Sequence, residues 1–232
     1  MCRRLAQERR EVVALLAPSR RPLGLAVDLG PGGAAREVGP VRPFARQGAG
    51  APLPLQGELG GEGGLWVVDV STPSDPTEVG SYDTLGQAYN VAVAGSYAYV
   101  ADRNSGLQVI DITILQFPQK VGSAGTPGSA LGVAISGNYA YVADGYSGLQ
   151  VIDVTDPADP SEVGRYRAID TRAQFSGVTL AGTHAFVTDD HHDLRVIDVS
   201  DPASPSLVVH QRWLSSVVDV DVVGQLAYAV NN

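Results

Sequence analysis

Residues 189 to 193 read Asp-Asp-His-His-Asp, and their side chains are of the types that bind metals. Imidazole and carboxylate groups are ligands that zinc and other divalent cations accept in proteins. Adjacent side chains on one tight turn diverge, so we interpret the stretch as an exposed polar turn, with a divalent-cation site as the alternative. No catalytic residue is predicted, because no serine, cysteine or paired acid is placed by the sequence to act with His191 or His192.

This turn belongs to a unit that is repeated along the chain. The stretch "GLQVIDV" starts at Gly148, and near-copies start at Gly64, Gly106 and Asp193, at intervals of 42, 42 and 45 residues. The units therefore span residues 64–105, 106–147, 148–192 and 193–232. Whatever the turn does, the repeated unit must position it.

Four short strands are predicted in each unit. "GLQVIDV" alternates as a strand packed on both faces does, and the next strand, such as "DPSEVGRY", opens with proline, which is tolerated at a sheet edge. Stretches such as "LGVAISGNYAYVAD" contain two strands joined across Gly-Asn. A two-residue loop that begins with glycine is typical of a type II′ hairpin. Each unit is thus predicted to be a four-stranded antiparallel meander.

A period of about 42 residues with four strands per unit predicts an all-β fold, a β-propeller with about four blade equivalents. The ring could close with four blades, or the chain could be a fragment of a ring of six to eight. Aspartates recur at the blade corners, where we expect their side chains to accept hydrogen bonds within turns rather than to bind metal. These are Asp69, Asp111, Asp153 and Asp198, and the Asp-Pro residues Asp75, Asp156, Asp159 and Asp201.

The stretches "GLQVIDVTDPADPSEVG" and "YAYVADG" resemble the LVIVD repeat family of β-propellers. The resemblance covers residues 64–232 and includes the apolar strand, the Asp-Pro turn, the Val-Gly of the outer strand and the Tyr-Val-Ala-Asp strand. It implies a bacterial or archaeal protein, often exported or at the cell surface, without established catalytic residues. Function must then come from a site on the fold.

The loops on one face of the propeller carry the candidate site. The turn "DDHHD" replaces its sister turns "DRNSG" and "DGYSG", and the loop before it, "RAIDTRAQ", holds the three-residue insertion. Because both departures lie at one blade junction, we predict that binding concentrates there. The predicted binding residues are Arg172, Asp190, His191 and His192, with the aromatic and cationic loop residues Arg103, Tyr146 and Trp213 completing the surface.

The central channel is a second candidate. Aligned inner strands place Asn90, Gly132, Gly177 and Asp219 at one position, and Asp221 two residues beyond Asp219. Small residues there are expected on steric grounds, since the blades converge. Asn90, Asp219 and Asp221 depart from this rule and are channel candidates for a cation or water, although an imperfect terminal repeat would also explain the two aspartates.

The ends of the chain differ from the repeats. Residues 1–63 contain no copy of the unit and show no sustained period beyond a short "REVVALLA" turn. We expect an irregular, disordered segment, and a start-site or reading-frame error in the sequence is the alternative. At the other end the chain stops at "AYAVNN", halfway through a blade.

The net charge of the chain limits the classes of partner that it can bind. Residues 1–63 carry nine arginines and six acidic residues, whereas the rest carries seven basic and nineteen acidic residues, a net charge of −12. Such a surface repels phosphate backbones, so nucleic acid is not expected, and no apolar run is long enough for membrane insertion. No signal peptide is visible.

We predict a binding or scaffold propeller for a protein or carbohydrate partner, extracellular or at the cell surface, without a cofactor. The alternative is a divalent-cation-dependent hydrolase or lyase.

Overall fold

The computed structural model describes residues 12–16, 26–29, 35–38, 63–169, 173–189, 193–212 and 217–231, and every regular element among them is a β-strand. No helix long and apolar enough to cross a membrane occurs in these segments. The strands are β1 (Val12–Leu16), β2 (Ala26–Leu29), β3 (Ala35–Val38), β4 (Gly64–Asp69), β5 (Thr77–Asp83), β6 (Asn90–Ala94), β7 (Tyr97–Ala101), β8 (Leu107–Asp111), β9 (Gln119–Ala124), β10 (Gly132–Ser136), β11 (Tyr139–Ala143), β12 (Leu149–Asp153), β13 (Ser161–Tyr166), β14 (Phe175–Ala181), β15 (His184–Asp189), β16 (Leu194–Asp198), β17 (Ser206–Gln211), β18 (Val217–Val223) and β19 (Leu226–Asn231).

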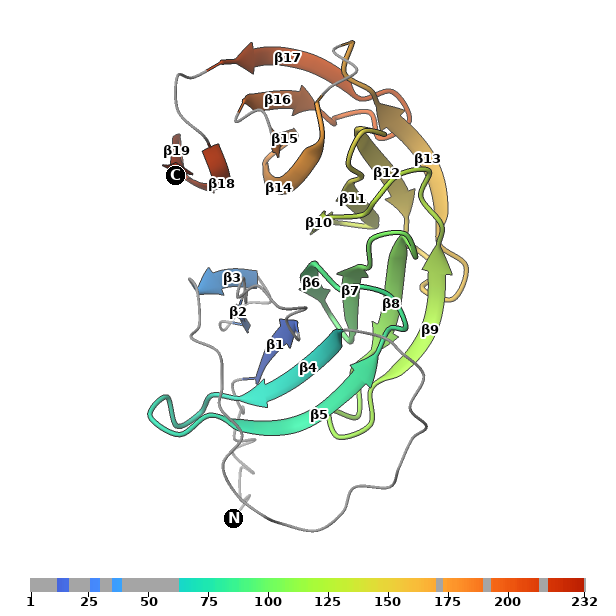
Figure 1. The fold of residues 1–232 in the computed structure, drawn as a ribbon, viewed down its shortest axis with the longest axis vertical. Coiled ribbons are helices and arrows are strands. Elements are labelled where there is room, and N and C mark those ends of the chain that lie inside the picture. The colour runs from blue at the N-terminus through green and yellow to red at the C-terminus, as the bar shows by residue number, and fades with distance from the viewer. Residues whose placement is uncertain are drawn as a thin grey trace, which may run out of the picture.

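Three four-stranded antiparallel sheets make up the middle part of the chain. Their strand orders are β6-β7-β8-β9, β10-β11-β12-β13 and β14-β15-β16-β17, so each is a meander. The innermost strands β6, β10, β14 and β18 lie towards a common centre and the outermost strands lie at the periphery (Figure 1). The predicted β-propeller of four-stranded blades is therefore confirmed. The sheets β1-β4-β5 and β18-β19 flank the three complete blades.

Glycine sets the hairpin that joins the first two strands of each sheet. Gly95, Gly137, Gly182 and Gly224 have φ values of 60°, 57°, 59° and 64°, and the residue that follows each of them is not in the left-handed region. This combination defines the type II′ turn and matches the two-residue loops seen in the strand registers. The hairpin type predicted from the sequence is thus the one present.

Aspartates close the turns between the third and fourth strands. Asp69, Asp111, Asp153 and Asp198 each accept a hydrogen bond from the backbone N–H two residues on, at 2.7 to 2.9 Å. Asp156 and Asp201, three residues further along the same turns, likewise accept hydrogen bonds from the backbone N–H two residues on, at 2.9 and 3.1 Å. Asp75 and Asp159 contribute to these turns through their backbone N–H groups. The expected side-chain role in turns is therefore confirmed for six of the eight corner aspartates, whereas Asp75 and Asp159 act through the main chain.

The core consists of layers between neighbouring sheets. Leu107 and Val109 of β8 pack with Val142 and Ile152 of the following sheet, and Leu149 of β12 packs in the same way against the blade beyond it. Both faces of the sheets β6-β7-β8-β9 and β10-β11-β12-β13 are thus buried against their neighbours, which explains why β8 and β12 have no exposed side.

The outermost strands carry a glycine where the next blade docks. A Cβ built on Gly80, Gly122 or Gly164 would overlap the carbonyl oxygen of Leu115, Pro157 or Pro202, which belong to the corner turn of the following blade. The glycine of the Val-Gly pair therefore allows the corner turn of the next blade to pack closely against the outermost strand. In β17 the equivalent residue is Val209, which is half-exposed.

Strands are present within the N-terminal segment for which irregular structure was expected. β1, inside "REVVALLA", pairs antiparallel with β4 from Val12↔Asp69 to Leu16↔Leu65, and β2 pairs with β3. In its sheet, β1 occupies the place that β7 occupies beside β8. The predicted boundary between an irregular segment, residues 1–63, and the repeats stays a prediction.

Candidate functional site

Two kinds of loop meet at one end of the blades. The linking loop joins the outermost strand of one sheet to the innermost strand of the next, and the inner turn joins the second and third strands within a sheet. Arg103 and Ala130 exchange two backbone hydrogen bonds of 2.9 Å between an inner turn and the next linking loop, and Gly145 and Phe175 exchange two of 3.0 and 3.1 Å. These bonds fix the linking loops and inner turns side by side, on a surface that we call the loop face.

A cavity of about 540 Å³ opens on the loop face at the β5-β6 linking loop. Its size lies within the range of small-molecule and side-chain binding sites. The lining residues come from the linking loop and from the inner turn after β7, namely Leu85, Gly86, Gln87, Asp102, Arg103, Asn104 and Ser105.

Backbone strain is concentrated at this cavity. Among the described residues, Leu85 (φ 62°) and Arg103 (φ 46°) are the only non-glycine residues in the left-handed region, and both line the cavity. In the next blade the equivalent positions hold Pro127 and Gly145, residues that suit their local backbone without this strain. The fold itself therefore does not require the strained residues.

The side chain of Arg103 is held at the cavity by its neighbours. Its guanidinium carbon lies 5.1 Å from the centre of the Tyr89 ring, and its Nη1 donates a short hydrogen bond to Oε1 of Gln87. Tyr89 is itself 41% exposed, so this cation–π pair is open to solvent on one side. Arg103, one of the predicted binding residues, is thus oriented by the linking loop.

A buried carboxylate lies behind the cavity. Asp102 is fully buried; its Oδ1 accepts a hydrogen bond of 2.9 Å from the Thr84 hydroxyl, and its Oδ2 has no hydrogen-bond partner. Burial raises the pKa of Asp102 to about 6, against the opposing effect of the Thr84 and Ser105 hydroxyls. Gly86 lies directly over the carboxylate, where any Cβ would overlap it.

The sister carboxylate in the next blade is fully satisfied. Asp144 accepts 2.6 Å and 2.8 Å hydrogen bonds from the Thr126 hydroxyl and the Gly128 N–H. Burial also raises the pKa of Asp144, partly offset by these two donors. Pro127 stands between the donors where the first loop has the left-handed Leu85. We attribute the missing donor at Asp102 to this difference in the linking loop.

A different arrangement serves the third carboxylate of the series, Asp189. Ala173 stands at the position of the glycine in the linking loop, and Arg195 stands where the other blades have Gln108 and Gln150. Arg195 forms a buried ion pair with Asp189 and lies 5.3 Å from the centre of the Phe175 ring. Asp189 thus has a counter-ion, which Asp102 and Asp144 do not have among the described residues.

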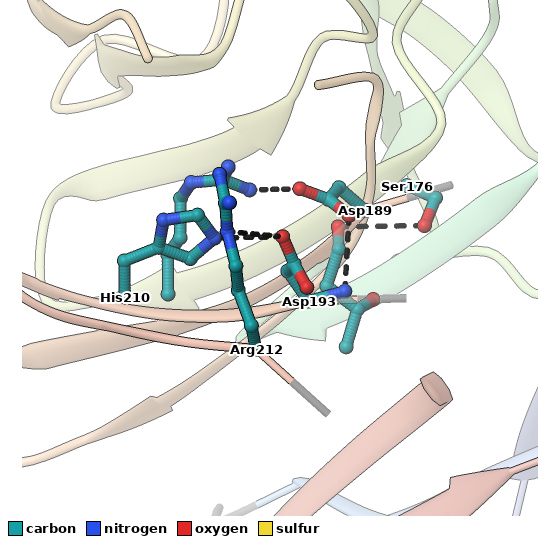
Figure 2. Close-up of polar contacts among 7 residues, drawn as sticks. Ser176, Asp189, Asp193, His210 and Arg212 are labelled. Carbon is teal, nitrogen blue, oxygen red and sulfur yellow. Dashed lines mark hydrogen bonds and ion pairs between the residues drawn. The ribbon is translucent and has the colours of Figure 1, made fainter. Parts of the chain in front are cut away.

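A second polar group adjoins this ion pair. Asp193, which replaces the glycine of the other inner turns, accepts a 2.7 Å contact from Nε2 of His210 and lies 3.6 Å from Nε of Arg212. Figure 2 shows the side chains of His210 and Arg212, both from the β17 end of the blade, directed at Asp193. The Asp193 N–H also donates a 3.1 Å hydrogen bond to Oδ1 of Asp189. The cluster joins charge on the loop face to the blade interior.

The other predicted site residues are distributed as follows. Tyr146 is on the inner turn after β11 and is 59% exposed, Asn90 accepts a 3.1 Å hydrogen bond from the Val133 N–H of the neighbouring inner strand, and Asp221 is exposed on β18. Asp219 is in β18, and its side chain is not described. Arg172, Asp190, His191, His192 and Trp213 lie outside the described residues. Within the described part of the chain, no group of three or more His, Cys, Asp or Glu side chains is placed to hold a metal ion.

The buried carboxylates and their partners were not singled out from the sequence. Asp102, Asp144 and Asp189 end each "YVAD" or "FVTD" strand and were interpreted only as part of the repeat. One signal was present. In the fourth unit, Arg195 in place of Gln and Asp193 in place of Gly introduce two opposite charges two residues apart, which points to a polar arrangement that the other units lack.

Comparison with known proteins agrees with this architecture. The LVIVD repeat pattern matches residues 60–84, 85–123, 127–168 and 174–210, and no curated protein matches the chain. Among solved structures, the chain is similar to BamB from Moraxella catarrhalis, at 14% identity and a TM-score of 0.53. The match covers 72% of this chain and 52% of BamB, so the chain spans about half the length of that structure. At this identity the likeness shows the fold alone.

Proposed function

Because this chain belongs to the LVIVD repeat family, whose repeats here build the blades of a β-propeller, we propose that it is a non-catalytic binding propeller that presents its loop face to a protein partner. The observation that carries the proposal is the strain at the cavity. Leu85 and Arg103 keep left-handed backbones that cost roughly 1 kcal/mol or more each, although the next blade makes the inner turn with Gly145 and has Pro127, outside the left-handed region, in its linking loop. Strain of this kind is found at ligand-binding positions.

The composition of the loop face supports a protein partner. Arg and Tyr are enriched at protein interfaces, and Arg103, Tyr89 and Tyr146 are partly or largely exposed there. Hydrophobic side chains are packed in layers between the blades behind these loops, so a rigid support holds the loop residues in place.

The junction between the third and fourth units is part of the proposed surface. Arg172, Asp190, His191 and His192 are proposed to bind there beside the Asp193 cluster. Replacing "DDHHD" by the sister turn "DGYSG" is expected to leave the fold intact, because that sequence already serves the preceding blade. A partner that binds this variant as tightly as the parent would remove the junction from the surface.

We also propose an extracellular or cell-surface location, in keeping with the family. Protease treatment of intact cells of the source organism checks it. Loss of the full-length protein before lysis is the expected result, and protection until lysis would contradict it.

Paired glutamate substitutions on opposite faces test the proposed function. One variant carries Asn104→Glu and Tyr146→Glu on inner turns, and the control carries Ser96→Glu and Asn138→Glu on the hairpins at the other end of the strands; all four residues are exposed. A partner is first identified by cross-linking in the source organism, purified, and titrated against each full-length variant. The loop-face pair is expected to weaken binding at least tenfold, and the hairpin pair to leave it within about twofold. Equal effects, or a larger effect of the hairpin pair, would refute the loop face as the binding surface.

A further inference from the structure

We infer that the cavity at the β5-β6 linking loop is a carboxylate-binding site in which Arg103 pairs with the ligand, an acidic or C-terminal carboxylate of a peptide segment. The inference rests on the proposed function, because it names the chemistry by which the loop face would hold its partner. Four observations carry it.

The first is the unused capacity of the Arg103 side chain. Guanidinium has five N–H donors in a plane, and the Gln87 contact uses Nη1. Throughout the described segments, no carboxylate forms an ion pair with Arg103. A planar cation with free donors at the edge of a cavity matches the geometry of a carboxylate, which it can bind through two parallel hydrogen bonds.

The second is the orientation of this cation. The Tyr89 ring holds one face of the guanidinium, and Gln87 holds one nitrogen, so the remaining donors have little freedom left to lose on binding. Preorganised donors gain affinity because less rotamer entropy is lost. Neither neighbour carries a charge, so neither neutralises the positive charge of Arg103.

The third is the polar edge beside Arg103. Asn104 is exposed, and its Oδ1 accepts a 3.2 Å hydrogen bond from the Ser129 hydroxyl, which directs its Nδ2 donors away from Ser129. A carboxylate has more acceptor sites than one guanidinium edge can fill. Asn104 is therefore placed to donate a further hydrogen bond to it.

The fourth is the strained backbone at Arg103. Its sister residue Gly145 has φ 58° and makes the same pair of hydrogen bonds to the next linking loop, so glycine serves the turn without a Cβ. The arginine side chain contacts Tyr89 and Gln87, yet the sister turn forms its backbone hydrogen bonds with a glycine that has no such contacts. The side chain therefore accounts for the strain if it binds something outside the described chain.

The buried Asp102 makes the site sensitive to pH. Its carboxyl group lies behind the cavity, and its charged neighbours are Asp83 on β5, Lys120 on β9 and Arg103 itself. Ionised Asp102 would oppose an anionic ligand, whereas neutral Asp102 would not. Because its pKa is about 6, carboxylate affinity is expected to rise severalfold as the pH falls from 7.5 to 5.5. The net charge of the repeats acts more weakly, since salt screens it beyond about 8 Å.

Short peptide probes test the inference on the full-length protein. N-acetyl-Ala-Ala offers a C-terminal carboxylate, N-acetyl-Glu-amide offers a side-chain carboxylate, and N-acetyl-Ala-Ala-amide offers neither. Binding is followed by NMR shifts of the ¹⁵N-labelled backbone amides. Saturable shifts at Gln87, Asn104 and Ser105 are expected with one or both carboxylates and not with the neutral peptide, and the stronger probe identifies the source. Equal shifts with the neutral peptide would overturn the inference.

Substitutions separate Arg103 from general charge. Arg103→Gly is expected to abolish the saturable shifts, Arg103→Lys to weaken them about tenfold through loss of the paired donors, and Arg165→Gln on exposed β13 to leave them unchanged. Glycine suits the left-handed turn, so the Arg103→Gly variant should stay folded and its spectrum should stay as well dispersed as that of the parent. Gly145→Arg, which puts the same strain in the sister turn, is expected to lower stability. Saturable binding that survives Arg103→Gly would refute the site.

The two proposals can fail separately. If the peptides bind through Arg103 but the purified partner binds the loop-face glutamate variant as tightly as the parent, the site stands and the proposed function does not. If the partner requires the loop face but no carboxylate probe binds, the proposed function stands and this inference is wrong. An Asp102→Asn variant that shows the same pH dependence as the parent would remove Asp102 from the explanation of that dependence.

Discussion

At the scale of single residues, the repeat exposes differences that one blade alone would hide. Asp102, Asp144 and Asp189 occupy the same buried position, yet one has an oxygen without a partner, one has two donors and one has an arginine. The strands around them are nearly identical, so the differences come from the linking loops and from position 195. A buried carboxylate oxygen without a hydrogen-bond donor lowers the stability of the fold by about 1 to 3 kcal/mol.

The unpaired oxygen of Asp102 predicts a stability that depends on pH. The pKa of Asp102 in the folded protein is about 6, above its usual value of 3.8, so its contribution to stability is present below pH 3.8 and is lost as the pH rises through 6. Asp102→Asn does not ionise. It is expected to be no more stable than the parent at pH 4 and to gain on it by up to ~3 kcal/mol at pH 8, measured by urea denaturation.

Asp144→Asn is the matched control for Asp102→Asn. Both oxygens of Asp144 accept hydrogen bonds, so the amide would lose one of them. This variant is expected to be less stable than the parent at pH 8. A stability difference between Asp102→Asn and the parent that is constant from pH 4 to pH 8 would contradict the role assigned to Asp102.

The buried Asp189–Arg195 pair predicts a large effect of one substitution. Arg195→Gln installs the residue found in the two preceding blades, but Ala173 stands where those blades have the glycine of the linking loop. The carboxylate would be left without its counter-ion, so unfolding free energy is expected to fall by about 3 to 5 kcal/mol in urea titrations. Adding Asp189→Asn should restore most of the loss. A single variant as stable as the parent would show that the pair is dispensable.

At the scale of elements, the outermost strands connect neighbouring blades through glycine. Gly80, Gly122 and Gly164 leave room for the corner turn of the next blade, and that turn is itself held by aspartate side chains. β17 departs from this pattern because Leu207 replaces a charged residue and Val209 replaces the glycine. Both side chains are more than 40% exposed, so β17 presents an apolar outer strand.

The docking role of these glycines is tested by installing the β17 residue elsewhere. Gly122→Val would place a side chain on the carbonyl of Pro157, so the two blades would have to separate locally. A loss of about 3 kcal/mol or more is expected in chemical denaturation. Val209→Gly in β17 is the control and should change stability by less than about 1 kcal/mol. Similar effects of both substitutions would argue against a docking contact at Gly122.

At the scale of the whole molecule, the blades lie in a series around a common centre (Figure 1), and hydrophobic clusters join each of the three four-stranded sheets to the sheet before it. Stability in such arrays comes mainly from contacts between neighbours. The first repeat strand, β4, has β1 on one side and β5 on the other. The N-terminal segment therefore contributes backbone pairing to the end of the series.

Truncation measures what this pairing contributes. Deleting residues 1–62 removes β1 and leaves the edge of β4 without its partner, whereas deleting residues 1–11 leaves β1 in place. The longer deletion is expected to lower the melting temperature and to self-associate in light-scattering measurements, because unpaired strand edges bind one another. The shorter deletion should match the full chain. Identical behaviour of both would show that residues 63–231 do not depend on β1.

The sequence by itself determined the strands of the repeats, their meander, the II′ hairpins and most of the aspartate turns, because each depends on neighbouring residues whose pattern recurs at a fixed period. It also determined that the linking loops and inner turns share one face, since that follows from the meander. Only the tertiary structure decided which carboxylates are satisfied, that Leu85 and Arg103 are left-handed, that Arg103 meets Tyr89 and Gln87, and that β1 pairs with β4. The Arg103–Tyr89 contact joins residues 14 positions apart, the Thr84–Asp102 hydrogen bond joins residues 18 apart, and the β1-β4 pairing joins residues up to 57 apart. Local propensity carries no information on such distances, so packing alone selected them.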